Sequence, residues 1–303
     1  MKDERTPPRV RALLLEVPQV KAFGERKGLK PTSNYQEYVQ LPRPAAVWVV
    51  SACRPLKFES KEWSFPLVGR FPYLGWFSRE GAESFAEDLR KEGWDVDVRG
   101  AAAYSTLGWF RDAILSTMIS RGEEALGELV NVVLHESVHA TWYVDGQAFF
   151  NESLASFVAD RLTSDYFSLA QGKDSPLFAA YLEAQKRGAG RVKKLHEAFV
   201  ALDRIYADSA LSDEVKLARK GEQLARLKTE LGFQRELNNA TLVQFKTYST
   251  GFQEFERLLA HCGGDGRRFW KKMREVTSGH FPSSQAQELR EVIAPLLRNV
   301  CGS

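Results

Sequence analysis

The sequence has few cysteines, and they form no recognisable metal-binding pair. Cys53, Cys262 and Cys301 lie far apart and without CxxC spacing. This pattern excludes a zinc knuckle and a dense disulfide framework. We expect free or buried thiols, with a single Cys53–Cys262 or Cys262–Cys301 bridge as the alternative.

Long apolar runs and an excess of one charge are also lacking. No run approaches the ~20 apolar residues that span a bilayer, and the N-terminal MKDERTPPRV has no signal-peptide core, so we expect a soluble chain. The 42 basic and 39 acidic residues leave a formal net charge of +3, which argues against nucleic acid as a partner. The 44% of hydrophobic residues are ample for a buried core in a chain of 303 residues.

Hydrophobic patterning predicts an α+β fold whose strands come early. Residues 45–52 and 65–77 are rich in β-branched and aromatic residues, and WDVDVRG at 94–100 alternates as a strand does. We expect a small mixed or antiparallel sheet, covered by a helix that Ser78 caps. Apolar residues at 9–28 follow near-helical spacing, which Pro18 is expected to interrupt.

The pattern is helical from about residue 112 onward. This part of the sequence predicts helices over 123–143, 151–169, 175–187, 191–230, 240–262, 266–276 and 284–299. We therefore divide the chain into an α+β region with sheet and edge strand, residues 1–122, and a helical region, residues 123–303. Together they are expected to form one compact catalytic unit.

The helical region contains HESVH, which places His135, Glu136 and His139 in an otherwise apolar stretch. An α-helix turns ~100° and rises ~1.5 Å per residue, so the histidines lie ~40° apart around the axis and ~6 Å apart along it. Both imidazoles can therefore reach one metal ion. Glu136 projects beside this face, where its carboxylate can act as a general base without being a ligand.

A tetrahedral zinc ion needs a third protein ligand if one position is left to water. FFNESLASF supplies Glu152, and Asn151 is expected to cap a helix that begins there. An Asp-Gly turn at Asp145 and Gly146 would fold this helix back on the first. Asp145 and Asp160 are the rival ligands.

Three segments carry a family resemblance. WSFPLVGRFPYLGWF, VRGAAAYSTLGWFRDAILSTM and HESVHATWYVDGQAFFNESLASF resemble, in order and spacing, a bacterial family described as putative zinc-dependent aminopeptidases. That family belongs with the gluzincins, the thermolysin-like HExxH-plus-Glu peptidases, and the match is strongest over about residues 30–167. The resemblance implies one zinc ion per chain, held by His135, His139 and Glu152, with Glu136 as the catalytic carboxylate.

The sequence also departs from that family. Members usually begin with a signal or lipoprotein segment, which is missing in this sequence. The resemblance nevertheless implies a cell-envelope or periplasmic location and membrane anchoring of the full-length protein. Many members have cysteines at the positions of Ser64 and Arg70, so their disulfide cannot form here. The G-x-M-E-N segment with which gluzincin aminopeptidases hold the substrate amine is absent, which leaves exopeptidase and endopeptidase action both open.

Two further roles have candidates in the sequence. AAAYSTLGWF is expected to form an edge strand that pairs with an extended peptide, with Tyr104 and Ser105 lining the groove or serving as ordinary strand and turn residues. We choose Tyr248 to stabilise the oxyanion, because LNNATLVQFKTYST resembles the family's distal motif. The other candidates are His196, His261, His280, Tyr143 and Tyr166.

These residues predict a zinc metallopeptidase that cleaves peptide bonds. Glu136 would take a proton from the attacking water and pass it to the leaving amine. The alternative is a non-catalytic module of the cell envelope in which zinc staples two helices that bind a peptide or protein. Glu136 argues against this alternative, because a structural zinc site has no use for a base and prefers a fourth protein ligand.

Overall fold

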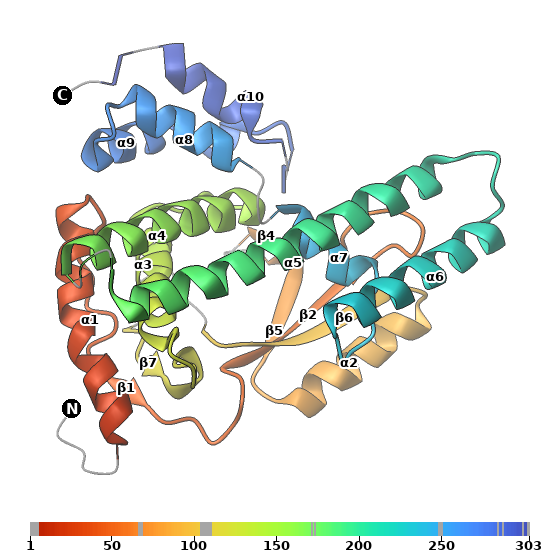
Figure 1. Cartoon of the computed structure of the whole chain (residues 1–303). Coiled ribbons are helices and arrows are strands. Elements are labelled where there is room, and N and C mark those ends of the chain that lie inside the picture. The colour runs from red at the N-terminus through yellow and green to blue at the C-terminus, as the bar shows by residue number, and fades with distance from the viewer. Residues whose placement is uncertain are drawn as a thin grey trace. The chain divides into compact units, whose positions relative to one another are not determined.

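The computed structural model describes residues 6–65, 69–103, 111–170, 172, 174–247, 251–283, 285–286, 288–298 and 300–301 (Figure 1). The chain forms two compact units. The first comprises Met1–Ala46, Ala102–Gln185 and Thr250–Ser303, and the second comprises Val47–Ala101 and Lys186–Ser249. The expected α+β class is confirmed, with small sheets early in the chain and helices after them. The predicted division into an α+β region, residues 1–122, and a helical region, residues 123–303, was based on secondary structure and stays a prediction.

The first unit is mainly helical. Its elements are α1 (Pro8–Arg26), β1 (Tyr38–Val39), β7 (Ile114–Leu115), η1 (Ser116–Met118), α3 (Ala125–Thr141), α4 (Ala148–Ala170), the first part of α5 (Pro176–Ala207), α8 (Phe252–His261), α9 (Gly266–Met273), η2 (Ser278–His280), α10 (Arg290–Ile293) and η3 (Ala294–Arg298). β1 and β7 pair in parallel. One apolar cluster joins α1, α3, α4 and α8, and it includes the fully buried Leu134, Leu154 and Phe255.

Helix α1 continues through Pro18, so the expected interruption was wrong. Proline removes one backbone hydrogen bond and disfavours a helix interior. The buried side chains Val17, Val20 and Phe23 lie on both sides of it and pack into the core of the first unit. Burial of this apolar face offsets the cost of the proline.

The second unit contains the larger sheet. Strands β2 (Val47–Cys53), β5 (Tyr73–Trp76) and β6 (Asp95–Ala101) form an antiparallel sheet in the order β5-β2-β6. Helix α2 (Arg79–Lys91) begins after Ser78, whose hydroxyl accepts a hydrogen bond from the Gly81 N–H at 3.1 Å, as the capping prediction requires. Its alanine and leucine side chains pack on Val50 and Val96 of the sheet.

A separate hairpin contains Ser64 and Arg70, the positions for which the family resemblance implies cysteines in other members. Strands β3 (Trp63–Phe65) and β4 (Gly69–Phe71) are antiparallel, and Ser64 lies directly opposite Arg70. Opposite residues of an antiparallel pair are close enough for a disulfide. The two positions are therefore placed as a disulfide between them would require.

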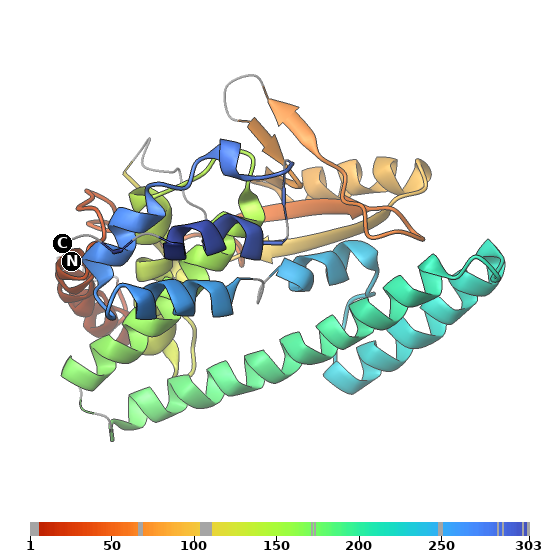
Figure 2. The same cartoon turned by 90° about the horizontal axis from the view of Figure 1, so that it is seen from above.

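Besides α2, the helices of the second unit are the later part of α5, α6 (Asp213–Leu231) and α7 (Asn239–Thr247). Figures 1 and 2 show α6 beside the second half of α5, where Gln223 donates to the carbonyl of Ala198. The predicted single helix over 191–230 was wrong, because α5 ends at Ala207 and Ser212 caps α6. α5 also runs unbroken through the predicted gap between 187 and 191.

The structure resolves the cysteine alternatives. Cys262 and Cys301 form a disulfide in the first unit, and Cys53 is a buried free thiol. The expectation of free thiols was therefore wrong for two of the three.

Among the described residues, none of the helices combines the length and apolarity needed to cross a membrane.

Candidate metal centre

Helix α3 places its two histidines as the spacing predicts. The side chains of Val133, Leu134 and Val138 are fully buried, which fixes the rotation of the helix about its axis. The Nε2 atoms of His135 and His139 then lie 3.2 Å apart. Two nitrogen donors one helical turn apart can bind the same ion.

Helix α4 brings the third donor. Glu152 Oε2 lies 3.3 Å from His135 Nε2, and Glu152 Oε1 lies 3.6 Å from His139 Nε2. One ligand atom from each of the three residues lies within 4.8 Å of the others, so the group could hold a metal ion. Two histidines and a glutamate are a ligand set of catalytic zinc sites.

Asn151 does not cap this helix, contrary to expectation. Helix α4 begins at Ala148, whose N–H donates to Gln285 Oε1 at 3.0 Å. The Asn151 side chain instead accepts from the Val144 N–H at 2.9 Å and donates to the Val144 carbonyl at 2.8 Å. The Asn151 side chain therefore ties the connection between α3 and α4 to the turn of α4 that carries Glu152.

The rival ligand Asp160 has another partner. Its Oδ1 accepts a hydrogen bond from Asn131 Nδ2 at 2.9 Å, and the same amide donates to the Tyr181 hydroxyl at 3.1 Å. Burial raises the pKa of Asp160, against the opposing effects of Asn131 and His135. Asp160 thus belongs to a polar group on α3, α4 and α5 that lies beside the histidines.

The two imidazoles differ in their affinity for protons. Burial lowers the pKa of His139 to about 4, so its ring is neutral near pH 7 and suited to metal binding. Burial also acts to lower the pKa of His135, but the hydrogen bond and charge of Glu152 outweigh it, and the pKa is raised. A metal ion in the group would replace the proton that Glu152 favours on His135.

Two other side chains on this part of the chain bear on chemistry. Glu136 is buried on α3, on the flank of the histidine face. The rings of Tyr143 and His139 meet edge to face with centroids 6.2 Å apart. Burial and the charges of Glu152 and Asp145 raise the pKa of Tyr143 to about 12, so its hydroxyl stays protonated near pH 7.

Other candidates from the sequence lie elsewhere or outside the description. Tyr104, Ser105 and Tyr248 fall outside the described residues. The Tyr166 hydroxyl lies 2.9 Å from a carboxylate oxygen of Glu16. The remaining histidines lie on other elements: His196 on α5, His261 at the end of α8 and His280 in η2, where its Nδ1 accepts from the Thr277 N–H.

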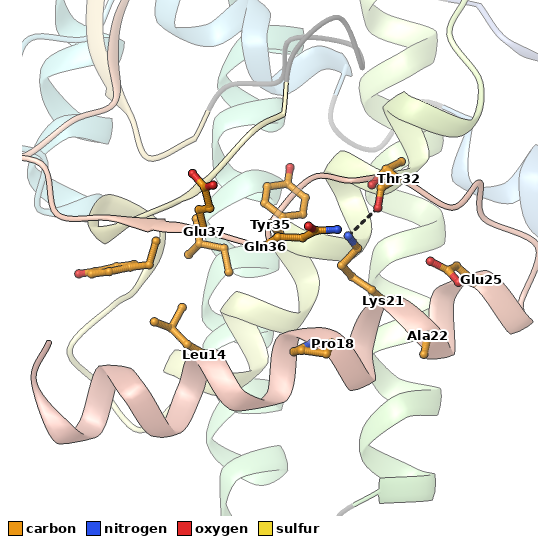
Figure 3. Close-up of a pocket in the computed structure, with 11 residues that line it drawn as sticks. Leu14, Pro18, Lys21, Ala22, Glu25, Thr32, Tyr35, Gln36 and Glu37 are labelled. Carbon is orange, nitrogen blue, oxygen red and sulfur yellow. Dashed lines mark hydrogen bonds between the residues drawn. The ribbon is translucent and has the colours of Figure 1, made fainter. Parts of the chain in front are cut away.

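A cavity of about 460 Å³ lies in the first unit between α1 and residues 32–38 (Figure 3). Lys21, Glu25, Tyr35 and Glu37 are among its lining residues, whereas the three candidate ligands are not. Tyr35 was missed by the sequence reasoning. Its backbone φ of 64° is a property of the folded chain and leaves no mark in the sequence.

Comparison with known proteins gives one finding. Residues 1–288 match the model of a family described as "Putative aminopeptidase". No match was found among curated proteins or among solved structures.

Proposed function

Because the chain belongs to the family described as "Putative aminopeptidase", we propose that it is a zinc metallopeptidase of the gluzincin type. The observation that carries the proposal is the convergence of His135, His139 and Glu152 from two helices, with donor atoms within 4.8 Å. Glu136 is adjacent in the chain and buried, where it can serve as a base. An aminopeptidase activity, which removes N-terminal residues, follows from the family description alone.

The donor set fits zinc. Two imidazole nitrogens and one carboxylate oxygen satisfy three of the four positions of a tetrahedral ion. Zinc bound there would polarise the peptide carbonyl and make water a stronger nucleophile at neutral pH. The neutral state of His139 supports this role, because a protonated imidazole cannot be a ligand.

The chain's own residues would then move the proton. Glu136 accepts it from the attacking water and delivers it to the nitrogen of the leaving amine. Its position on the flank of the histidine face supports this role, since a carboxylate there can approach the water without entering the ligand set.

The oxyanion needs a hydrogen-bond donor. We keep Tyr248 as the proposed donor on the grounds of the distal motif. Tyr143 is the competing candidate, supported by its ring contact with His139 and its protonated hydroxyl. Tyr248→Phe and Tyr143→Phe should be compared directly, and the variant with the larger loss of kcat identifies the donor.

We propose peptides as substrates, with Tyr104 and Ser105 as residues that bind them. We also propose a cell-envelope or periplasmic location, as the family resemblance implies. The Cys262–Cys301 disulfide supports this location, because such bonds persist in oxidising compartments.

A single experiment tests the proposed activity. The purified protein is incubated with a mixed peptide library, with and without a zinc chelator, and the cleavage positions are read by mass spectrometry. We expect chelator-sensitive removal of single N-terminal residues. Internal cleavage would retain the metallopeptidase and reject the aminopeptidase, whereas the absence of chelator-sensitive cleavage would reject both.

A further inference from the structure

Tyr35 has an unusual backbone conformation. Its φ is 64°, and Gln285 is the other non-glycine residue with a positive φ in the described part of the chain. This left-handed region is disfavoured for any residue with a Cβ atom, and for a bulky side chain it is a true outlier. Such conformations persist only where the surroundings enforce them, and they cluster at functional sites.

Hydrogen bonds on both sides hold the segment that carries Tyr35. The Tyr35 N–H donates to the carbonyl of Asp112 at 2.6 Å. The side chain of Asn34 donates to the Asp112 carboxylate and accepts from the Asp112 N–H, each at 3.2 Å. Lys21 on α1 donates to the carbonyl of Thr32 at 2.8 Å (Figure 3) and also to the carbonyl of Asn34. The conformation of Tyr35 is therefore set by bonds to two other parts of the first unit.

The same segment runs along the metal-binding helix. The Lys30 N–H donates to Thr141 Oγ1 on α3 at 2.9 Å. Thr32 borders a small cavity together with Leu134 and Ser137 of α3. Residues 30–35 thus pack beside the stretch of α3 that contains the HESVH motif.

The hydroxyl group of Tyr35 is buried and has no hydrogen-bond partner among the described residues. The residue as a whole is 6% exposed. Figure 3 shows this hydroxyl pointing away from α1. Burying an unpaired hydroxyl costs free energy, and phenylalanine would fill the same space without that cost. Packing alone therefore does not account for a tyrosine here.

The charge of Glu136 contributes to the pKa of this hydroxyl. Burial, followed by the negative charges of Glu136 and Asp112, raises the pKa of Tyr35. The phenol is consequently neutral near pH 7 and available as a donor. Glu136 is itself buried. The proposed general base and the Tyr35 hydroxyl, a hydrogen-bond donor, are therefore both buried in the first unit.

We propose that Tyr35 is a positioning residue whose hydroxyl donates a hydrogen bond to the Glu136 carboxylate when metal and substrate are bound. The inference rests on the proposed function, in which Glu136 moves the proton. Hydrogen bonds in catalytic sites are often unformed in the free enzyme and tighten only in the complex. The hydrogen bonds to Asp112 fix the backbone from which the Tyr35 side chain extends, and Tyr35 is not among the three candidate metal ligands.

The test compares Tyr35→Phe with a matched control, Tyr38→Phe, in the zinc-loaded full chain. Tyr38 lies in β1 and lines the 460 Å³ cavity together with Tyr35, but its hydroxyl donates to Gln40 Oε1 at 2.7 Å. We expect Tyr35→Phe to lower kcat by roughly 10-fold or more, with KM within about twofold and zinc content unchanged. Its Tm should not fall, because an unpaired buried hydroxyl is removed. Tyr38→Phe should match the wild type in kcat and KM.

A double-mutant cycle decides whether Tyr35 acts through Glu136. In the Glu136→Gln background, Tyr35→Phe should cause no further loss of kcat, since the carboxylate that it positions is already gone. A full additional loss, or a Tyr35→Phe variant with wild-type kcat, would overturn this inference and leave the peptidase intact. A wild-type protein that cleaves no peptide would overturn both.

Discussion

Replacement of Asn151 distinguishes two roles for this residue, a helix N-cap and a side chain that bonds to the backbone of Val144. Asparagine and aspartate are nearly equivalent as helix N-caps, so a capping Asn151 should tolerate Asn151→Asp. In the structure, however, the amide donates to the Val144 carbonyl and accepts from the Val144 N–H, at a site that is 2% exposed. Aspartate cannot donate, and it would place a carboxylate against that carbonyl.

The expected loss of stability follows from these two bonds. Asn151→Ala leaves the Val144 N–H buried without a partner, which costs about 1–3 kcal/mol. It also removes one of the two hydrogen bonds that the Val144 carbonyl accepts, worth about 1 kcal/mol, while the bond from the Gln147 N–H at 3.2 Å remains. We therefore expect a loss of about 2–4 kcal/mol in the free energy of unfolding of the first unit. Asn151→Asp retains one bond but buries a charge without a counter-ion, and we expect a loss of about 3 kcal/mol or more. Loss of a cap alone would cost about 1 kcal/mol.

Urea unfolding of the chelator-treated protein, followed by circular dichroism, measures these differences. Ser78→Asp is the control, because Ser78 is a true N-cap and should accept aspartate with little change. Zinc affinity should also weaken in both Asn151 variants, since they loosen the connection that places Glu152. An Asn151→Asp protein as stable as the wild type would refute the reasoning.

Three further predictions concern the metal centre. The protein should bind about one zinc ion per chain, and elemental analysis should find it lost in His135→Ala and in His139→Ala, whereas full occupancy in both variants would contradict the ligand assignment. Glu136→Gln should retain zinc while peptide cleavage falls by roughly 10² or more, and a wild-type rate would make Glu136 a bystander. Because Glu152 raises the pKa of His135, protons should compete with zinc, so the apparent affinity measured by competition with a chromophoric chelator should fall as the pH is lowered. A pH-independent affinity would contradict that competition.

Several features of the fold could be predicted because they depend on neighbours in the chain. The alternation in WDVDVRG corresponds to β6, and the stretch from 45 to 52 corresponds closely to β2. Ser78 caps α2 through a bond that spans three residues. Such short-range signals survive folding whatever the rest of the chain does.

Helix ends and breaks were predicted less well, because distant residues decide them. The start of α4 is displaced from residue 152 to Ala148, where Gln285 supplies the acceptor for the first turn. Pro18 is tolerated because neighbouring side chains of α1 are buried in a core that the local pattern does not describe. The Cys262–Cys301 bond likewise depends on how the last helices return to α8.

The candidate site divides in the same way. The sequence alone determines that His135 and His139 share one face of a helix with Glu136 beside it, because helical geometry relates residues one turn apart. Tertiary structure decides that Glu152 reaches both imidazoles, since this requires α4 to fold back on α3 in one register. Tertiary structure also decides the left-handed backbone of Tyr35. The Tyr35 N–H donates to the Asp112 carbonyl, and Lys21 on α1 donates to the carbonyl of the preceding Asn34. Local geometry therefore specifies the motif, and long-range packing specifies which groups surround it.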